Sequence, residues 1–275
     1  MSLKSSLAIT AGKTSHWFLH NFMHGGTSLP GKLTLKIDPD VLQALAKDYE
    51  IAIITGTNGK TLTTALTVKV LEAKYGNVLT NKSGSNMKQG IVTAFLTAKT
   101  GKSGKKIAVL ETDEANVPII CEYIKPKLFV LTNLFRDQMD RYGEIYTTYD
   151  KILKGVLMHP DALVLANGDA PIFNSKKLPN KVIYYGFENQ TEKEQLAPAN
   201  TDGLLCPSCQ HILHFKYRSY SNLGKYFCPE CGFKRPELTY KVTALTQQTP
   251  QSSSFKINDH PSSCTSGGLT IFITP

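Results

Sequence analysis

The stretch from residue 51 to residue 61 reads IAIITGTNGKT and decides the fold class. Its first five residues are mostly apolar and β-branched, which is typical of a buried strand. The glycines at 56 and 59 permit a tight turn, and we expect a helix from Lys60 to about Lys74. A strand, a glycine-containing turn that ends in Lys-Thr, and a helix together form the context of a phosphate-binding loop.

This loop predicts a binding site for ATP and Mg²⁺. Backbone N–H groups and the helix N-terminus would bind phosphates, Lys60 would reach the β- and γ-phosphates, and the Thr61 hydroxyl would ligate Mg²⁺. Residue 54 is Ile where the eight-residue pattern has Gly, so the loop is a shorter variant. The alternative is a Gly-Lys-Thr turn that arises by chance. The predicted nucleotide-binding residues of the loop are Gly56, Thr57, Asn58, Gly59, Lys60 and Thr61.

A second apolar strand, Lys106–Glu111, ends in a carboxylate. In parallel α/β sheets the carboxyl ends of the strands face the ligand crevice. We therefore expect Glu111 to bind Mg²⁺ together with Thr61, and we expect Lys60 and Glu111 to be catalytic. The alternative for Glu111 is a solvated residue at the end of a strand.

Apolar runs alternate with helical stretches through much of the chain. Continuously apolar strands that alternate with helices predict an α/β fold with a mostly parallel sheet covered by helices. A short amphipathic helix suits residues 38–47, the last thirty residues show no helix period, and we expect an irregular tail after about residue 260. The expected strands are 51–55, 77–80, 107–110, 128–131, 162–166, 182–185 and 238–245, and the further helices are 89–99, 117–123 and 145–157.

Two CxxC pairs interrupt the α/β pattern within residues 201–236. The pairs are Cys206 with Cys209 and Cys228 with Cys231. This spacing is typical of a zinc ribbon, and four thiolates fill the coordination sphere of a structural Zn²⁺. A redox role for either pair is the alternative, and His211 and His214 lie between the pairs as less favoured ligands.

The composition is that of a globular protein. Of 275 residues, 41% are hydrophobic and 19% charged, and the net charge of +9 favours anionic partners such as nucleotide phosphates, an anionic substrate, nucleic acid or acidic lipids. No apolar run is long enough for a transmembrane segment, and no signal peptide is evident. We therefore expect a cytoplasmic protein, in which the isolated Cys121 and Cys264 are inert.

Several motifs together resemble the ATP-binding central domain of the Mur ligases. They are the phosphate-binding loop, Glu111, the Thr132-Asn133-Leu134 segment followed by Asp137 and Asp140, and Asn167-Gly168-Asp169. Residues 24–31, HGGTSLPG, and the four-cysteine insert make the chain similar, within that superfamily, to the MurT family of ligase-like subunits of lipid II isoglutaminyl synthase. The resemblance implies that Asn167 and Asp169 contact nucleotide. The alternative is an ordinary Asn-Gly-Asp turn.

The resemblance also implies the reaction and the partners. ATP would phosphorylate the α-carboxylate of D-glutamate in the stem peptide of lipid II, and ammonia would displace phosphate from the acyl phosphate to give D-isoglutamine for peptidoglycan. The ammonia would come from a GatD-type glutamine amidotransferase in a heterodimer. We expect the protein to meet the inner face of the membrane through its substrate, and we expect no nucleic acid as partner.

The resemblance implies a domain organisation, and the chain departs from the pattern of the Mur ligases in two ways. Residues 1–47 would be a short N-terminal segment, and residues 48–275 a central domain that is incomplete at its C-terminus and carries the zinc ribbon at 201–236. The C-terminal ligase domain would be absent, so we expect nucleotide and zinc binding with little or no amidation. Many Mur ligases have a metal-binding His within Asp-His-Leu-Asp, but residues 137–140 read DQMD, so a second metal site would differ or be absent.

Two other functions remain open from the residues. One is a different P-loop ligase or kinase, which would share the loop but not the ribbon. The other is a nucleotide-regulated nucleic-acid-binding protein, since the ribbon is rich in basic and aromatic residues.

Overall fold

The structure is a computed structural model, and it describes residues 2–22, 28–81, 84–98, 104–135, 144–188, 195–196, 205–249, 252–265 and 272–273. Internal contacts divide the chain into two units. The first comprises Met1–Val130 and Asp150–Leu163, and the second comprises Leu131–Tyr149 and Val164–Pro275. None of the described helices has the length and apolarity that a membrane crossing requires.

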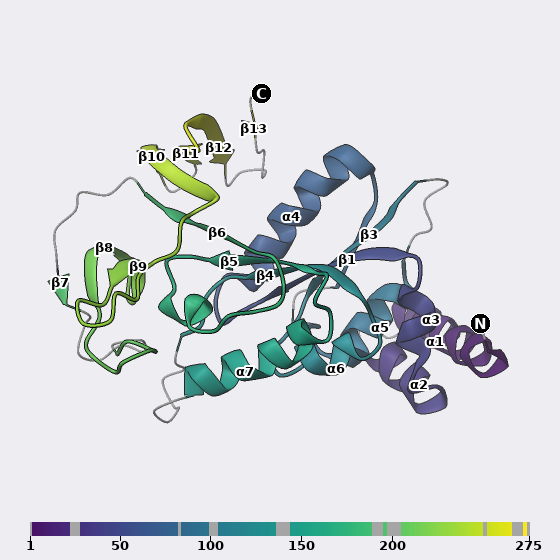
Figure 1. The fold of residues 1–275 in the computed structure, drawn as a ribbon. Helices are drawn as coiled ribbons and strands as arrows, with labels where there is room; N and C mark the ends of the chain where they lie inside the picture. The colour runs from purple at the N-terminus through teal and green to yellow at the C-terminus, as the bar shows by residue number, and fades with distance from the viewer. Residues whose placement is uncertain are drawn as a thin grey trace. The chain divides into compact units, whose positions relative to one another are not determined.

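The first unit is built on parallel strands in the order β4-β1-β3-β2. β1 and β3 are buried over most of their length, as their continuous apolar sequence predicts. Figure 1 shows α4 on one side of these strands and α5 and α6 on the other. The strands are β1 (Tyr49–Thr55), β2 (Val78–Thr80), β3 (Lys106–Glu111) and β4 (Pro126–Leu131), and the helices are α4 (Lys60–Tyr75), α5 (Lys88–Leu96), α6 (Val117–Cys121) and α7 (Glu144–Leu157), whose first residues belong to the second unit.

Among the described residues before β1 there are three helices, and the sequence predicted only one of them. α3 (Val41–Ala46) lies in the expected place, but α1 (Leu3–Phe22) and α2 (Leu29–Ile37) were not predicted. Pro30 lies in the first turn of α2, where proline is well tolerated. Gly31 is required for packing, because a Cβ there would lie 1.9 Å from the carbonyl oxygen of Gln89 in α5.

The second unit contains a mixed sheet in the order β13-β12-β11-β10-β6-β5 and a separate three-stranded antiparallel sheet in the order β7-β8-β9. β5, β6 and β10 are parallel, and β10 to β13 are antiparallel. The strands of the mixed sheet are β5 (Leu163–Asn167), β6 (Val182–Phe187), β10 (Tyr240–Gln248), β11 (Ser252–Ile257), β12 (His260–Thr265) and β13 (Phe272–Ile273). The other three are β7 (Gln195–Leu196), β8 (His214–Tyr220) and β9 (Leu223–Phe227), and a short 3-10 helix spans Pro171–Asn174.

The expectation of an irregular tail after about residue 260 was wrong for residues 260–265, which form β12. β11 and β12 form a hairpin in which Ile257 pairs with His260. The two residues between them, Asn258 and Asp259, have φ angles of 47° and 69°. Two left-handed residues give the tight turn whose twist matches antiparallel strands, and Asn and Asp tolerate that conformation. The polar side chains of these strands hid the alternation by which strands are usually recognised.

Candidate functional site

The phosphate-binding loop lies where β1 passes into α4. Gly56 and Gly59 have φ angles of 132° and 78°, a range that favours glycine. Gly59 directly precedes α4, and its carbonyl accepts the N–H of Thr63 at 2.9 Å. Because the first N–H groups of a helix have no partner within that helix, this turn leaves a set of donors at the carboxyl end of β1. Such an end is suited to anions.

Two carbonyl groups of the loop and the carboxylate of Glu114 bind the Lys60 ammonium. Its Nζ donates to the carbonyl oxygen of Gly56 and, at 3.3 Å, to that of Thr57. It also forms an ion pair with Glu114 Oε1 at 3.1 Å, and both charged side chains are 14% exposed. A bound phosphate would compete with Glu114 for this ammonium. Sequence reasoning missed Glu114, which lies 54 residues from Lys60 and belongs to no local pattern.

β3 brings Glu111 to the same edge of the sheet as the loop. Glu111 pairs with Ile54 in the parallel register, and the N–H of Thr112 donates to the Ile54 carbonyl at 2.9 Å. The loop begins at Gly56, two residues beyond this pair. The structure therefore brings together the two elements that the sequence assigned to one site.

Asn81 fixes the backbone of Glu111, and sequence reasoning missed it. Its Oδ1 accepts the N–H of Glu111 and its Nδ2 donates to the Glu111 carbonyl, both at 2.9 Å. The same Nδ2 donates to the Ser85 carbonyl at 2.9 Å. Asn81 directly follows β2 and is 5% exposed. A polar residue immediately after a neighbouring parallel strand was the signal that could have indicated it.

The Glu111 side chain fits a cation ligand. It is 4% exposed, and within the part of the chain that the structure describes no hydrogen bond or ion pair engages its carboxylate. A buried carboxylate without a cation is costly. Mg²⁺ is commonly bound by one carboxylate, a loop hydroxyl and substrate phosphates. Glu111 and Thr61 remain the predicted ligands.

Asn167 and Asp169 form a tight turn at the end of β5. Asn167 donates from Nδ2 to the Thr132 carbonyl and accepts the N–H of Asp169 at Oδ1, both at 3.0 Å. The two side chains are 9% and 2% exposed. Their role in nucleotide binding stays a prediction, and the contacts of both side chains are internal to the second unit.

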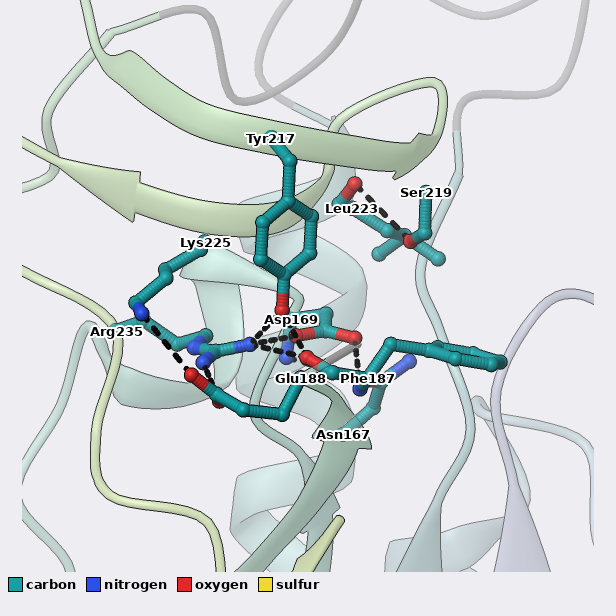
Figure 2. A network of polar contacts seen from close by, with 9 residues as sticks. All are labelled: Asn167, Asp169, Phe187, Glu188, Tyr217, Ser219, Leu223, Lys225 and Arg235. Atoms are coloured by element: carbon teal, nitrogen blue, oxygen red, sulfur yellow. Dashed lines mark hydrogen bonds and ion pairs between the residues drawn. The ribbon is translucent and has the colours of Figure 1, made fainter. Parts of the chain in front are cut away.

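Asp169 lies in a network of ion pairs and hydrogen bonds (Figure 2). Its Oδ1 accepts a hydrogen bond from Arg235 Nη1 at 2.8 Å, and its Oδ2 accepts the N–H of Phe187 at 2.9 Å. Burial raises the pKa of Asp169, although the hydrogen bond from Phe187 and the charge of Arg235 act to lower it. The carboxylate therefore depends on Arg235 for its charge compensation.

Arg235 connects Asp169 to the cysteine-containing segment. Its Nη1 also donates to the hydroxyl of Tyr217 in β8 at 2.8 Å, and its Nη2 donates to Glu188. Lys225 in β9 pairs with the same Glu188 at 2.9 Å. Burial acts to raise the pKa of Glu188, but the hydrogen bond from Lys225 and the charge of Arg235 outweigh it and lower that pKa. The ribbon strands and the Asn-Gly-Asp turn thus share one set of charges.

The four predicted zinc ligands come together. All four Sγ atoms lie within 4.8 Å of one another, and His211 and His214 are not in this group. Sγ of Cys206 lies 3.5 Å from that of Cys231, and Sγ of Cys209 lies 3.4 Å from that of Cys228. Tetrahedral zinc with Zn–S bonds of about 2.3 Å separates its sulfurs by roughly 3.8 Å, whereas a disulfide needs about 2.05 Å. The donor set fits one structural Zn²⁺.

Both CxxC pairs adopt the same turn. The N–H of Gln210 donates to the Cys206 carbonyl at 2.9 Å, and the N–H of Gly232 donates to the Cys228 carbonyl at 3.2 Å. Gln210 and Gly232 have φ angles of 64° and 74°. Two equivalent turns present two thiolates each, as a zinc ribbon requires. The buried residues that pack with Cys206 and Cys228 are Leu213, Phe215 and Tyr226.

Two parts of the sequence motifs lie outside the described residues. They are residues 137–140, on which the prediction about a second metal site depends, and residues 24–27 of the N-terminal motif. Both predictions stay as they were made.

Comparison with protein families identifies the kind of domain. The Mur ligase middle domain matches residues 54–217, from the end of β1 through the phosphate-binding loop, Glu111 and Asp169 and into the cysteine-rich segment. The chain belongs to the Mur ligase family. This assignment confirms the predicted fold class, an α/β Mur-ligase-type domain with a mostly parallel sheet, and the cysteine cluster fits the predicted zinc ribbon.

Two curated relatives extend the similarity to nearly the whole chain. This Mur ligase is 54% identical over 269 residues to the lipid II isoglutaminyl synthase (glutamine-hydrolyzing) subunit MurT of Streptococcus pneumoniae. The match covers 98% of this chain and 60% of the relative. It is 37% identical over 222 residues to the subunit of the same name from Staphylococcus aureus strain N315, covering 80% of this chain and 50% of the relative. The chain therefore spans about half to three fifths of these relatives.

A solved Mur ligase shares the fold. The MurF ligase from Thermotoga maritima in complex with ADP superposes with a TM-score of 0.55 at 13% sequence identity, covering 84% of this chain and 44% of that structure. At this identity the similarity concerns the fold.

Proposed function

We propose that this chain is the nucleotide-binding part of an ATP-dependent ligase subunit that amidates the stem peptide of lipid II. The substrate would be the α-carboxylate of D-glutamate, and the product D-isoglutamine in peptidoglycan synthesis. The observation that carries the proposal is the edge where β1 and β3 end, at which the Lys60 loop and Glu111 lie side by side. The choice of substrate is supported by the names of the two curated relatives.

The chemistry follows from the weakness of carboxylate as an electrophile. The γ-phosphoryl group of ATP would pass to a carboxylate oxygen, giving an acyl phosphate and ADP. Ammonia would then attack the acyl carbon and release phosphate. A GatD-type glutamine amidotransferase is proposed as the source of ammonia and as the partner in a heterodimer.

The residues of this site would contribute mainly charge and position. Lys60 would exchange its contacts with the loop carbonyls and Glu114 for phosphate oxygens. Glu111 and Thr61 would hold Mg²⁺, which supplies positive charge to the transferred phosphoryl group. Asn81 would keep Glu111 in place through its two backbone hydrogen bonds.

The remaining proposals concern the metal and the location. We propose that Cys206, Cys209, Cys228 and Cys231 bind a structural Zn²⁺. We also propose that the protein works in the cytoplasm, at the inner face of the membrane where its substrate lies.

The test has two arms, ATP binding and amidation of lipid II. Calorimetric titration of the chain with ATP and Mg²⁺ should give a signal that Lys60→Ala removes and Lys69→Ala retains, since Lys69 is an exposed lysine on the same helix. The chain is then combined with a GatD-type amidotransferase, glutamine, ATP, Mg²⁺ and lipid II. Amide product that disappears with Lys60→Ala supports the proposed chemistry and contradicts the expectation that this chain amidates little or not at all. ATP binding that survives both Lys60→Ala and Glu111→Gln would overturn the proposal.

A further inference from the structure

α1 has its large apolar side chains outside and its small residues inside. Its buried residues are Ser5, Ala8 and Gly12. A Cβ at Gly12 would lie 2.1 Å from Thr34 Oγ1 in α2, so this face packs closely on the protein. The exposed large apolar side chains of α1 are Leu3 (91%), Leu7 (65%), Trp17 (61%), Phe18 (51%) and Phe22 (65%).

These five apolar side chains lie on one face. At about 100° per residue, they fall within an arc of roughly 140°, and the three buried small residues lie on the other side of the helix. The same arc also carries the exposed polar side chains of Thr10, Thr14 and Asn21, but five exposed large apolar side chains on one helix are unusual for a globular protein and indicate an interaction surface. α2 repeats the pattern, because Leu29 and Leu33 are 52% and 40% exposed while Gly31 and Thr34 are buried.

The charged side chains of α1 and α2 are all of one sign. Residues 1–37 contain no Asp or Glu. At 100° per residue, Lys4 lies at one edge of the apolar arc of α1 and Lys13 lies about 40° beyond the other edge. Lys32 and Lys36 lie on α2. Lysine is depleted in protein–protein interfaces relative to the rest of the surface. Aromatic residues flanked by lysines, without carboxylates, are typical of helices that lie in the headgroup region of acidic bilayers.

We propose that the outer face of α1, formed by Leu3, Leu7, Trp17, Phe18 and Phe22 and flanked by Lys4 and Lys13, docks on an acidic lipid surface. The helix would lie in the plane of the interface with its apolar face in the bilayer. The lysines would add attraction to anionic headgroups. This docking needs neither nucleotide nor substrate, so it can be tested independently of the proposed ligase activity.

The chain contains its own reporter, because Trp17 is its only tryptophan. The chain is titrated with vesicles of phosphatidylglycerol and phosphatidylcholine, and with vesicles of phosphatidylcholine alone, while Trp17 emission is recorded. We expect a shift to shorter wavelength with the acidic vesicles that weakens as salt is raised. An unchanged spectrum, or an equal shift with the neutral vesicles, would overturn the proposal.

Variants of exposed side chains test whether the change in Trp17 emission comes from docking of α1 on the vesicles. Phe18→Glu should lower the partition constant at least 10-fold, and Lys4→Gln and Lys13→Gln about 5-fold each. Leu157→Glu, at the exposed end of α7, should leave it unchanged. Circular dichroism should show all four variants folded, since the altered side chains are exposed. If Phe18→Glu instead dissociates a self-associated form, and acidic vesicles leave the Trp17 emission of the unaltered chain unchanged, the face is a protein interface and the proposal is wrong.

Discussion

Arg235 donates to Asp169 at 2.8 Å, and the two side chains are 5% and 2% exposed. The pair connects the segment that follows the cysteine cluster to the turn after β5. A buried ion pair contributes little compared with well-packed apolar residues, but the loss of one partner leaves an uncompensated charge. The relationship therefore makes the position of the Asn-Gly-Asp turn depend on the ribbon.

Replacement of Arg235 should destabilise the protein strongly. We expect Arg235→Met to lower the free energy of unfolding by about 3–5 kcal/mol, because Asp169 would stay buried without its cation. Urea unfolding followed by circular dichroism measures this. Lys234→Met, at an exposed neighbouring position, is the matched control and should change stability by less than about 0.5 kcal/mol. Equal effects of the two variants would show that Asp169 does not need Arg235.

Glu188 should make a pH-dependent contribution to stability. Its pKa in the folded protein is lowered from the ordinary value of 4.5, so the folded state favours the charged form. This contribution is present above pH 4.5 and is lost as the pH falls through the lower folded pKa. Glu188→Gln should therefore be less stable than the wild type at pH 7, and the difference should shrink on acidification. A difference that grows at low pH would contradict the direction of this shift.

Removal of one cysteine of the cluster should release the metal. We expect about one Zn²⁺ per chain by mass spectrometry of the metal content, and none after Cys228→Ala, because three thiolates leave the tetrahedral site open. Cys121→Ala is the control. Cys121 lies outside the four-cysteine cluster, and burial raises the pKa of its thiol to about 12. Zinc that persists in Cys228→Ala would refute the four-thiolate site.

Glu114 should oppose nucleotide binding through Lys60. Because the two side chains are paired at 3.1 Å, a phosphate must displace the carboxylate from the ammonium. Glu114→Gln should therefore tighten ATP binding about 2- to 5-fold, a modest effect because part of each charge is screened by solvent. Calorimetric titration in the presence of Mg²⁺ measures the change. Binding that weakens 10-fold or more would assign Glu114 to the nucleotide side of the site instead.

Local patterns determined the elements and the chemical groups of the site. The loop at 56–61, the Glu111 strand and the two CxxC pairs each occupy a short stretch, and each has residue types that serve one purpose. The sequence also predicted the strands and α-helices between residues 49 and 187, because buried parallel strands are apolar throughout and alternate with helices.

Only the tertiary structure decided which distant residues serve those groups. Glu114 reaches Lys60 across 54 positions, Asn81 reaches Glu111 across 30, and Arg235 reaches Asp169 across 66. Single hydrogen bonds between distant residues leave no periodicity in the sequence, so they emerge only when the sheet sets the strand ends side by side. The outward apolar face of α1 was hidden for a related reason. The same residues would indicate a core-facing helix, and only the packing of Ser5, Ala8 and Gly12 shows which side faces the protein.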